Sequence, residues 1–271
     1  MPHTWVERNY CKMKKILFLS FLLFFYLSAN SQERKTGIIN DPDGYTNIRS
    51  GKGSSFEVIE KLYEDELFVY VDSADQNWLK VSITKCNCDT PYRLYNQIKG
   101  YVHRSRIKDV NELSKTKRKS LFAKIFETEL ELYNKIISAT DRKSKEYKHL
   151  NGKIKVFHDY QFNASLTSFT NYVCEFKDEE LVDQYMNLME SQEGSADEAP
   201  TYALGRMFVC DPDWTFKQIR KHITLMNQLE WGLVNVIYSM PAEEADEHKR
   251  KYNELRVSVG MSKVDFSLYD E

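Results

Sequence analysis

The sequence predicts a two-domain protein in which a small antiparallel β-barrel is followed by an all-α domain. From residue 36 to about 110, short β-branched and aromatic runs are separated by Gly, Asp, Asn and Ser, which is typical of antiparallel strands. From residue 121 onwards, the spacing of the apolar residues changes to the period of an α-helix. The chain of 271 residues, 42% of them hydrophobic, is long enough for two separate cores.

The barrel region opens with a turn and contains five strand-like runs. In residues 41–44, Pro42 presets φ for a turn and Gly44 tolerates a positive φ. A second, flexible turn is expected at residues 50–54. Five short strands within about seventy residues suit a small barrel. The expected strands cover residues 45–49, 58–63, 67–71, 78–83 and 100–103.

Three segments of this region, in this order, resemble the bacterial SH3-like domain. The resemblance covers residues 36–110. Lys52 stands where the family has a proline, and an insertion at residues 84–99 carries Cys86 and Cys88. The three segments are Gly44-Tyr45-Thr46-Asn47-Ile48-Arg49-Ser50-Gly51-Lys52-Gly53, Asn77-Trp78-Leu79-Lys80-Val81 and Gly100-Tyr101-Val102.

The resemblance implies that this domain binds cell-wall peptide or another extended ligand along an aromatic-lined groove. Aromatic rings would stack on the ligand, and neighbouring polar groups would set its direction. Two alternatives stay open: Trp78 and Tyr101 could instead fill the barrel core, and Arg49 could brace the turn that follows it. The candidate ligand-binding residues are Tyr45, Asn47, Arg49, Trp78 and Tyr101.

A linker is expected at residues 111–120, before a helical domain at residues 121–271. The basic run at 115–119 indicates either a solvated helix start or a contact with an anionic wall polymer. Residues 151–173 are ambiguous, because 153–157 alternate like a strand whereas 166–173 suit a helix. Amphipathic helices are expected at 121–137, at 179–190 and from Pro241 onwards, and capping boxes at 195–198 and 215–218 predict further helix starts.

The N-terminus carries a pattern typical of a signal peptide. Lys14 and Lys15 precede an apolar run at residues 16–27, and Ala29-Asn30-Ser31 supplies small residues for signal peptidase. We expect residues 1–31 to be removed, with Met13 as the true start, which places the mature protein in the periplasm or outside the cell. No stable membrane insertion is expected after cleavage. The alternative is a membrane anchor retained through residues 16–27.

The exported chain would keep an even number of cysteines in an oxidising compartment, where disulfides persist. Cys174 and Cys210 both lie in the helical region beside apolar residues, so we expect them to pair. Cys86 and Cys88 could then pair with each other only in a tight ring.

Charge and motifs argue against several function classes. The 38 basic and 40 acidic side chains nearly cancel, so nucleic acid is not an expected partner. His149, His158, His222 and His248 are scattered without a zinc or hydrolase motif. We therefore predict no catalytic residue, metal site or cofactor. The acidic cluster Glu190, Glu193, Asp197 and Glu198 could be read as a carboxylate pair for glycan hydrolysis, but Glu198 is already explained as a helix cap.

The expected function is therefore that of an exported, non-enzymatic cell-envelope binding protein, whose partner is cell-wall peptide or an envelope protein. Two alternatives remain: a cell-wall hydrolase with its site in the helical domain, and a secreted immunity or inhibitor protein.

Overall fold

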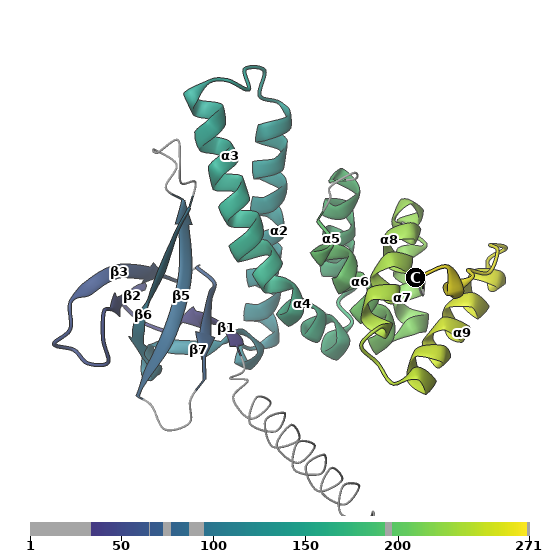
Figure 1. Ribbon diagram of the computed structural model, residues 1–271, viewed down its shortest axis with the longest axis horizontal. Coiled ribbons are helices and arrows are strands. Elements are labelled where there is room, and N and C mark those ends of the chain that lie inside the picture. The colour runs from purple at the N-terminus through teal and green to yellow at the C-terminus, as the bar shows by residue number, and fades with distance from the viewer. Residues whose placement is uncertain (1–33, 65, 73–76, 87–94, 193–196, 270–271) are drawn as a thin grey trace, which may run out of the picture.

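The computed structural model describes residues 34–64, 66–72, 77–86, 95–192 and 197–269. A curled antiparallel sheet comes first and an array of helices follows, as Figure 1 shows, which confirms the predicted fold class. The predicted signal peptide at 1–31 lies outside the described residues, and so do Cys88 and Glu193. None of the described helices is long and apolar enough to cross a membrane.

The seven-stranded sheet has the order β3-β2-β6-β5-β4-β1-β7 and forms a half-barrel. All five expected strands are present. Two more strands, the first and the last of the domain, pair with each other at one edge of the sheet. The strands are β1 (Arg34–Ile39), β2 (Tyr45–Arg49), β3 (Val58–Tyr63), β4 (Phe68–Val71), β5 (Trp78–Cys86), β6 (Tyr95–His103) and β7 (Ile107–Asp109).

Alternate residues of these strands fill the concave side of the sheet. The predicted turn before β2 is confirmed, since Gly44 has a φ of +72° and its N–H donates to the Asp41 carbonyl. Gly100 is required where β6 crosses β2, because a Cβ there would lie 2.6 Å from the Arg49 carbonyl oxygen. The buried core consists of Ile39, Ile48, Leu62, Phe68, Tyr70, Leu79, Val81, Ile83 and Val102.

The insertion at residues 84–99 lengthens the hairpin between β5 and β6. Its two ends continue both strands, with Cys86 opposite Tyr95. Cys86 is disulfide-bonded. At the tip of this arm, the ring of Tyr95 lies 6.3 Å from that of Tyr160 in the helical domain. The insertion therefore reaches the helices.

The helical domain starts earlier than predicted, inside the expected linker. Ser114 caps α2 by accepting the Lys117 N–H, so the basic run 115–119 forms the first turns of the helix. Lys115 and Lys117 are exposed, as a solvated helix start predicts, and Lys119 is half-buried. Arg118 is buried against Glu175 and the ring of Tyr172. The helices are α2 (Lys115–Ile137), α3 (Lys145–Phe157), α4 (Asn163–Phe176), α5 (Glu179–Ser191), α6 (Ala199–Cys210), α7 (Pro212–Ile219), α8 (Met226–Ile237) and α9 (Ala242–Ser258).

Residues 151–173 are helical throughout. A π-helical turn, His158–Phe162, joins α3 to α4, so the strand-like pattern at 153–157 was misleading. The backbone of that segment is fully hydrogen-bonded within one long helix. A short alternating pattern of five residues does not override these hydrogen bonds.

Two expected caps are wrong. Glu198 makes no side-chain cap on α6, where instead Asp197 accepts the Ala199 N–H. Thr215 lies inside α7 and donates to the Met207 carbonyl, because Asp211 already caps that helix with a proline behind it.

The helices stack in two rows. One row consists of α2, α5, α7 and α9, and the other of α4, α6 and α8, with each helix in contact with the next in its row. Figure 1 shows the array leading away from the sheet. In the second row, α6 and α8 cross at Gly205 and Gly232, where a Cβ on Gly205 would lie 2.1 Å from the Gly232 carbonyl oxygen.

The sheet and the helices share part of one core. Leu67 and Val110 are buried among the helical residues rather than in the barrel. The Gln161 side-chain amide pairs with the backbone of Leu67, accepting its N–H at 2.8 Å and donating to its carbonyl at 3.0 Å. Thr36 of β1 also donates to the Ala164 carbonyl of α4. The barrel is therefore docked on the helices.

Candidate functional site

The five candidate residues all lie on the convex side of the sheet. Along β2, Thr46 and Ile48 point into the core, so Tyr45, Asn47 and Arg49 point outwards. We call this convex surface of β2, β3, β5 and β6 the outer face. In pairing register it carries Tyr45, Asn47, Arg49, Lys61, Tyr63, Trp78, Lys80, Lys99, Tyr101 and His103.

The structure brings some of the five candidates into contact and separates others. Arg49 and Tyr101 are cross-strand partners, and Asn47 precedes Arg49 on the same face. Tyr45 pairs instead with Tyr63, at 6.4 Å between ring centroids. Trp78 makes an edge contact with His103 at 5.3 Å. The candidates therefore form an extended surface.

The alternative that Trp78 and Tyr101 fill the barrel core is wrong. Both are half-exposed, and their neighbours Leu79 and Val102 take the inner positions. The bracing role of Arg49 is confirmed, because its guanidinium donates to the Phe56 carbonyl at 2.7 Å. The aromatic rings of the outer face are therefore accessible to a ligand.

Lysine side chains lie over these rings. The Lys61 ammonium is 4.2 Å from the ring centroid of Tyr45, and the Lys52 ammonium is 5.8 Å from that of Tyr101. Lys52, which stands where the SH3-like pattern that the sequence resembles has a proline, adds a cation to the face. Cation–π contacts of this kind hold a positive charge above an aromatic surface.

The free edge of β3 is closed by charged side chains. The N–H groups of Lys61 and Tyr63 donate to the carboxylates of Glu60 and Glu66 at 2.8 and 3.0 Å. The Lys85 ammonium donates to the Lys61 carbonyl and lies within 3.7 Å of both carboxylates. Such side chains occupy the backbone groups that another strand would use.

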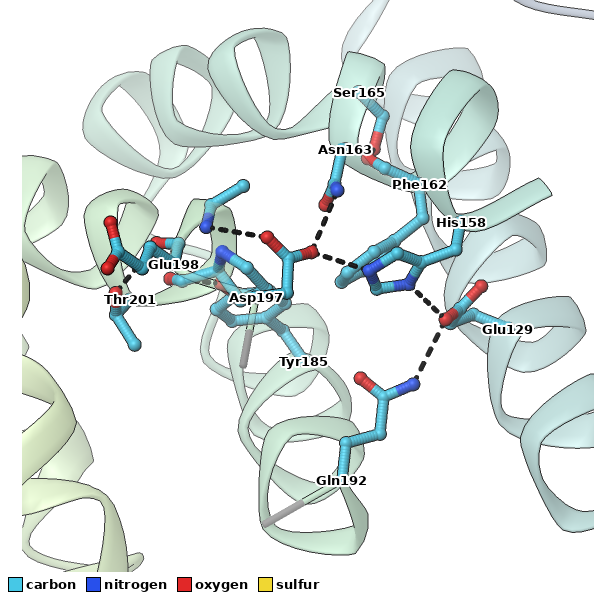
Figure 2. Close-up of polar contacts among 12 residues, drawn as sticks. Glu129, His158, Phe162, Asn163, Ser165, Tyr185, Gln192, Asp197, Glu198 and Thr201 are labelled. Carbon is cyan, nitrogen blue, oxygen red and sulfur yellow. Dashed lines mark hydrogen bonds and ion pairs between the residues drawn. The ribbon is translucent and has the colours of Figure 1, made fainter. Parts of the chain in front are cut away.

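A second polar site lies in the helical domain, around His158 on the π-helical turn. Figure 2 shows its ring between two carboxylates. Nδ1 donates to Glu129 Oε1 at 2.6 Å, and Nε2 donates to Asp197 Oδ2 at 2.5 Å. Gln192 donates to the same Glu129 oxygen, and Asn163 to the same Asp197 oxygen. We call these five residues the His158 cluster.

The two carboxylates hold His158 in its charged form. Burial opposes the charge, but the hydrogen bonds to Asp197 and Glu129 outweigh it and raise the pKa of His158 to about 10. For Asp197, burial is again outweighed, by His158, the Ala199 N–H and Asn163, and its pKa falls to about 2. An imidazolium that donates from both nitrogens has no free lone pair, so it cannot act as a general base.

His222, in the segment that joins α7 to α8, repeats this arrangement with two carboxylates of α5. Its Nδ1 lies 3.0 Å from Glu190 and its Nε2 lies 2.8 Å from Asp183. Burial is outweighed by these carboxylates, which raise the pKa of His222. Glu190, from the acidic run seen in the sequence, is thus a partner of His222 and also accepts from Thr224.

Sequence reasoning missed both sites. Glu129 lies on a helix face predicted to be apolar, and 29 residues separate it from His158. The sequence feature that could have revealed the first site is the position of Glu129 within an apolar helix face. A carboxylate in such a position is seldom fully buried without a partner. The predicted disulfide Cys174–Cys210 is confirmed and joins the ends of α4 and α6.

Among the described residues, no group of three or more His, Cys, Asp or Glu side chains could hold a metal ion. In comparisons with known proteins, no family model, no curated protein and no solved structure matches this chain.

Proposed function

We propose that the protein is an exported binding protein of the cell envelope, and that the outer face of its barrel binds a peptide of the cell wall or of an envelope protein. The observation that carries this proposal is the position of the five candidate residues, which all point to the solvent side of one sheet. Tyr45 and Tyr63 are 37% and 50% exposed, so both rings are accessible to a ligand.

The charge of the outer face favours an acidic ligand. It carries Arg49, Lys61, Lys80 and Lys99, and the positions that face them across the strands hold tyrosine, asparagine, valine and serine. A peptide with free carboxylates would meet cations beside aromatic rings, as in other recognition of acidic motifs.

The closed edge of β3 favours binding on the face rather than by strand addition. A ligand strand would have to displace Glu60, Glu66 and Lys85 from the backbone groups that they occupy. Side-chain stacking on the outer face needs no such exchange.

Two further observations fit this proposal. The disulfide Cys174–Cys210 is consistent with an oxidising compartment outside the cytoplasm. The hydrolase alternative draws no support from His158 or His222, because each ring has both nitrogens bound to carboxylates.

The test is sedimentation of the exported chain, starting at Gln32, with purified peptidoglycan. The whole chain is needed, since Leu67 and Val110 of the barrel lie in the helical core. Replacing Tyr45 with Ala should weaken binding by about 1–3 kcal/mol, as the loss of a stacking anchor does.

A matched control is Tyr238→Ala, which removes a tyrosine that is 62% exposed in the helical domain. It should bind like the wild type. Binding that is equal in Tyr45→Ala, Tyr101→Ala and the wild type would rule out the outer face, and a wild type that stays in the supernatant would rule out wall peptide as the ligand.

A further inference from the structure

A cavity of about 430 Å³ lies in the second helical row, between α4, α6 and α8. This volume is within the range of small-ligand sites, about 300–1,000 Å³. Its polar lining consists of Glu198, Tyr202 and Arg206 from the start and body of α6, Asn163 and Thr167 from α4, and Asn235 from α8. Leu166, Ala199 and Ala203 form an apolar part of the wall.

The two charged residues of this cavity and the tyrosine between them lie on one face of α6. Glu198, Tyr202 and Arg206 are spaced four residues apart, so they share one face of α6. Eight residues of helix rise about 12 Å. The Arg206 guanidinium leans over the Tyr202 ring, at 5.0 Å from its centroid, which shortens the span between the two charges.

The polar groups of the cavity have few partners of their own. Among the described residues, Arg206 faces no carboxylate within salt-bridge distance, and its one side-chain hydrogen bond is a 3.5 Å contact with Thr167. Neither the Glu198 carboxylate nor the Asn235 amide takes part in a side-chain hydrogen bond within the described parts of the chain. The buried Asn163 Oδ1 also lacks a partner there.

We propose that this cavity binds a short peptide with free ends, of two or three residues. Its carboxylate would pair with Arg206 in the bidentate geometry that a guanidinium favours, and its ammonium group would pair with Glu198. An extended chain advances about 3.3–3.6 Å per residue, so a tripeptide spans about 10 Å and fits between the two charges.

The remaining lining agrees with this ligand class. The Asn235 amide can exchange hydrogen bonds with the peptide groups, which need partners once they leave water. The wall of Leu166, Ala199 and Ala203 leaves room for small apolar side chains. This site is separate from the outer face of the barrel, and it would function whether or not the barrel binds wall peptide.

The experiment is isothermal titration of the exported chain with trialanine, and with dialanine as the shorter probe. Blocking the ammonium by N-acetylation or the carboxylate by amidation should each weaken binding by about tenfold or more, because each removes one charge-assisted pair. Arg206→Gln should weaken the binding of trialanine by a similar factor. This variant should also bind the amidated and the free peptide equally well. Glu198→Gln should lose the preference for a free ammonium group.

Two exposed residues of the same domain give matched controls. Arg220→Gln and Glu247→Gln remove the same charges elsewhere and should bind trialanine like the wild type. Circular dichroism and thermal unfolding of every variant separate loss of the site from loss of the fold. Tyr45→Ala should also keep trialanine binding, which separates this site from the barrel. Failure of trialanine and dialanine to bind the folded wild type would overturn the proposal, and so would equal binding of free and blocked peptides.

Discussion

His158 shows how one residue can join three parts of a fold. Glu129 comes from the middle of α2, His158 from the π-helical turn and Asp197 from the residues before α6. Glu129 is almost fully buried, with one oxygen, Oε2, that has no hydrogen-bond partner among the described residues. Removing the imidazolium would leave this carboxylate without its compensating charge.

We therefore predict that His158→Gln is strongly destabilising near neutral pH and less so in alkali. Loss of one partner of a buried pair costs about 3–5 kcal/mol. The pKa of His158 is raised from 6.5 to about 10 by folding, so its stabilisation is complete below pH 6.5 and is lost as the pH rises towards 10. Urea unfolding at pH 6, 8 and 10 should show the two proteins converging.

His248→Gln is the control for this prediction, because within the described parts of the chain His248 takes part in no hydrogen bond or ion pair. Its substitution should change the free energy of unfolding little. On the acid side, Asp197 sets a second limit. Its pKa falls from 3.8 to about 2, so its contribution is present above pH 3.8 and disappears as the pH falls through 2. A constant difference between wild type and His158→Gln from pH 6 to pH 10 would contradict the assigned charge state.

The alternation of residues along the strands is enough to predict which side chains lie on the outer face. In the segment Trp78-Leu79-Lys80-Val81, the two aliphatic residues share one side of a strand, which leaves Trp78 with Lys80 on the other side. The partners of His158 follow no such rule. They lie 29 and 39 residues away on separate elements, and only tertiary packing brings them together.

Among the elements, the π-helical turn does most to organise the molecule. One extra residue in the turn changes the direction of its side chains, so that His158 meets Glu129 and Asp197 while Gln161 meets the barrel. The amphipathic helices around it were predictable from their period. The turn was not, because a π-helical insertion leaves no regular pattern in the sequence.

The start of α7 was predictable, but from a different signal. Asp211 followed by Pro212 is a strong helix start, and it takes precedence over the capping pattern at residues 215–218. Thr215, expected as a cap, is instead fully buried and binds the carbonyl of Met207. Where two capping sequences lie a few residues apart, the packing of the helix determines which of them starts it.

The disulfide between Cys174 and Cys210 joins the C-terminal ends of two neighbouring helices of the second row. It closes a loop with a sequence separation of 36 residues. In the chain-entropy model, such a loop stabilises the folded state by about 3–4 kcal/mol. We predict that the double substitution Cys174→Ala and Cys210→Ala lowers the free energy of unfolding by about this amount.

Chemical denaturation of the oxidised protein, the reduced protein and the double variant measures the effect. The reduced wild type and the double variant should unfold at similar urea concentrations, both below the oxidised protein. If the reduced and oxidised proteins have the same midpoint, the link carries no stability. Peptide mapping without reduction gives the matched chemical check, because it should recover the two cysteines in one linked pair.

At the scale of the whole molecule, the barrel and the helices form one unit. The sequence predicts two domains with a linker between them, and the order and class of both are confirmed. Their docking was not predictable, because Leu67 and Val110 look like ordinary strand residues and yet lie in the helical core. Such long-range contacts depend on the relative orientation of the two parts, which no local pattern encodes.

Gln161 is the side chain that we expect to hold this orientation. Its amide completes both backbone hydrogen bonds of Leu67, a residue that is only 2% exposed. Replacing Gln161 with Ala would leave a buried N–H and a buried C=O without partners, at a cost of about 1–3 kcal/mol each if no water replaces the amide. We predict that Gln161→Ala loosens the barrel from the helices without unfolding either.

Hydrogen exchange followed by mass spectrometry tests this prediction directly. In Gln161→Ala, the amides of β4 should exchange faster, while those of β5 and β6 should keep their wild-type protection because their ladder is intact. Gln228→Ala, which removes a half-exposed glutamine from α8, is the matched control and should leave β4 unchanged. Protection of β4 that is equal in Gln161→Ala and the wild type would show that the shared core around Leu67 and Val110 is sufficient to hold the two parts together.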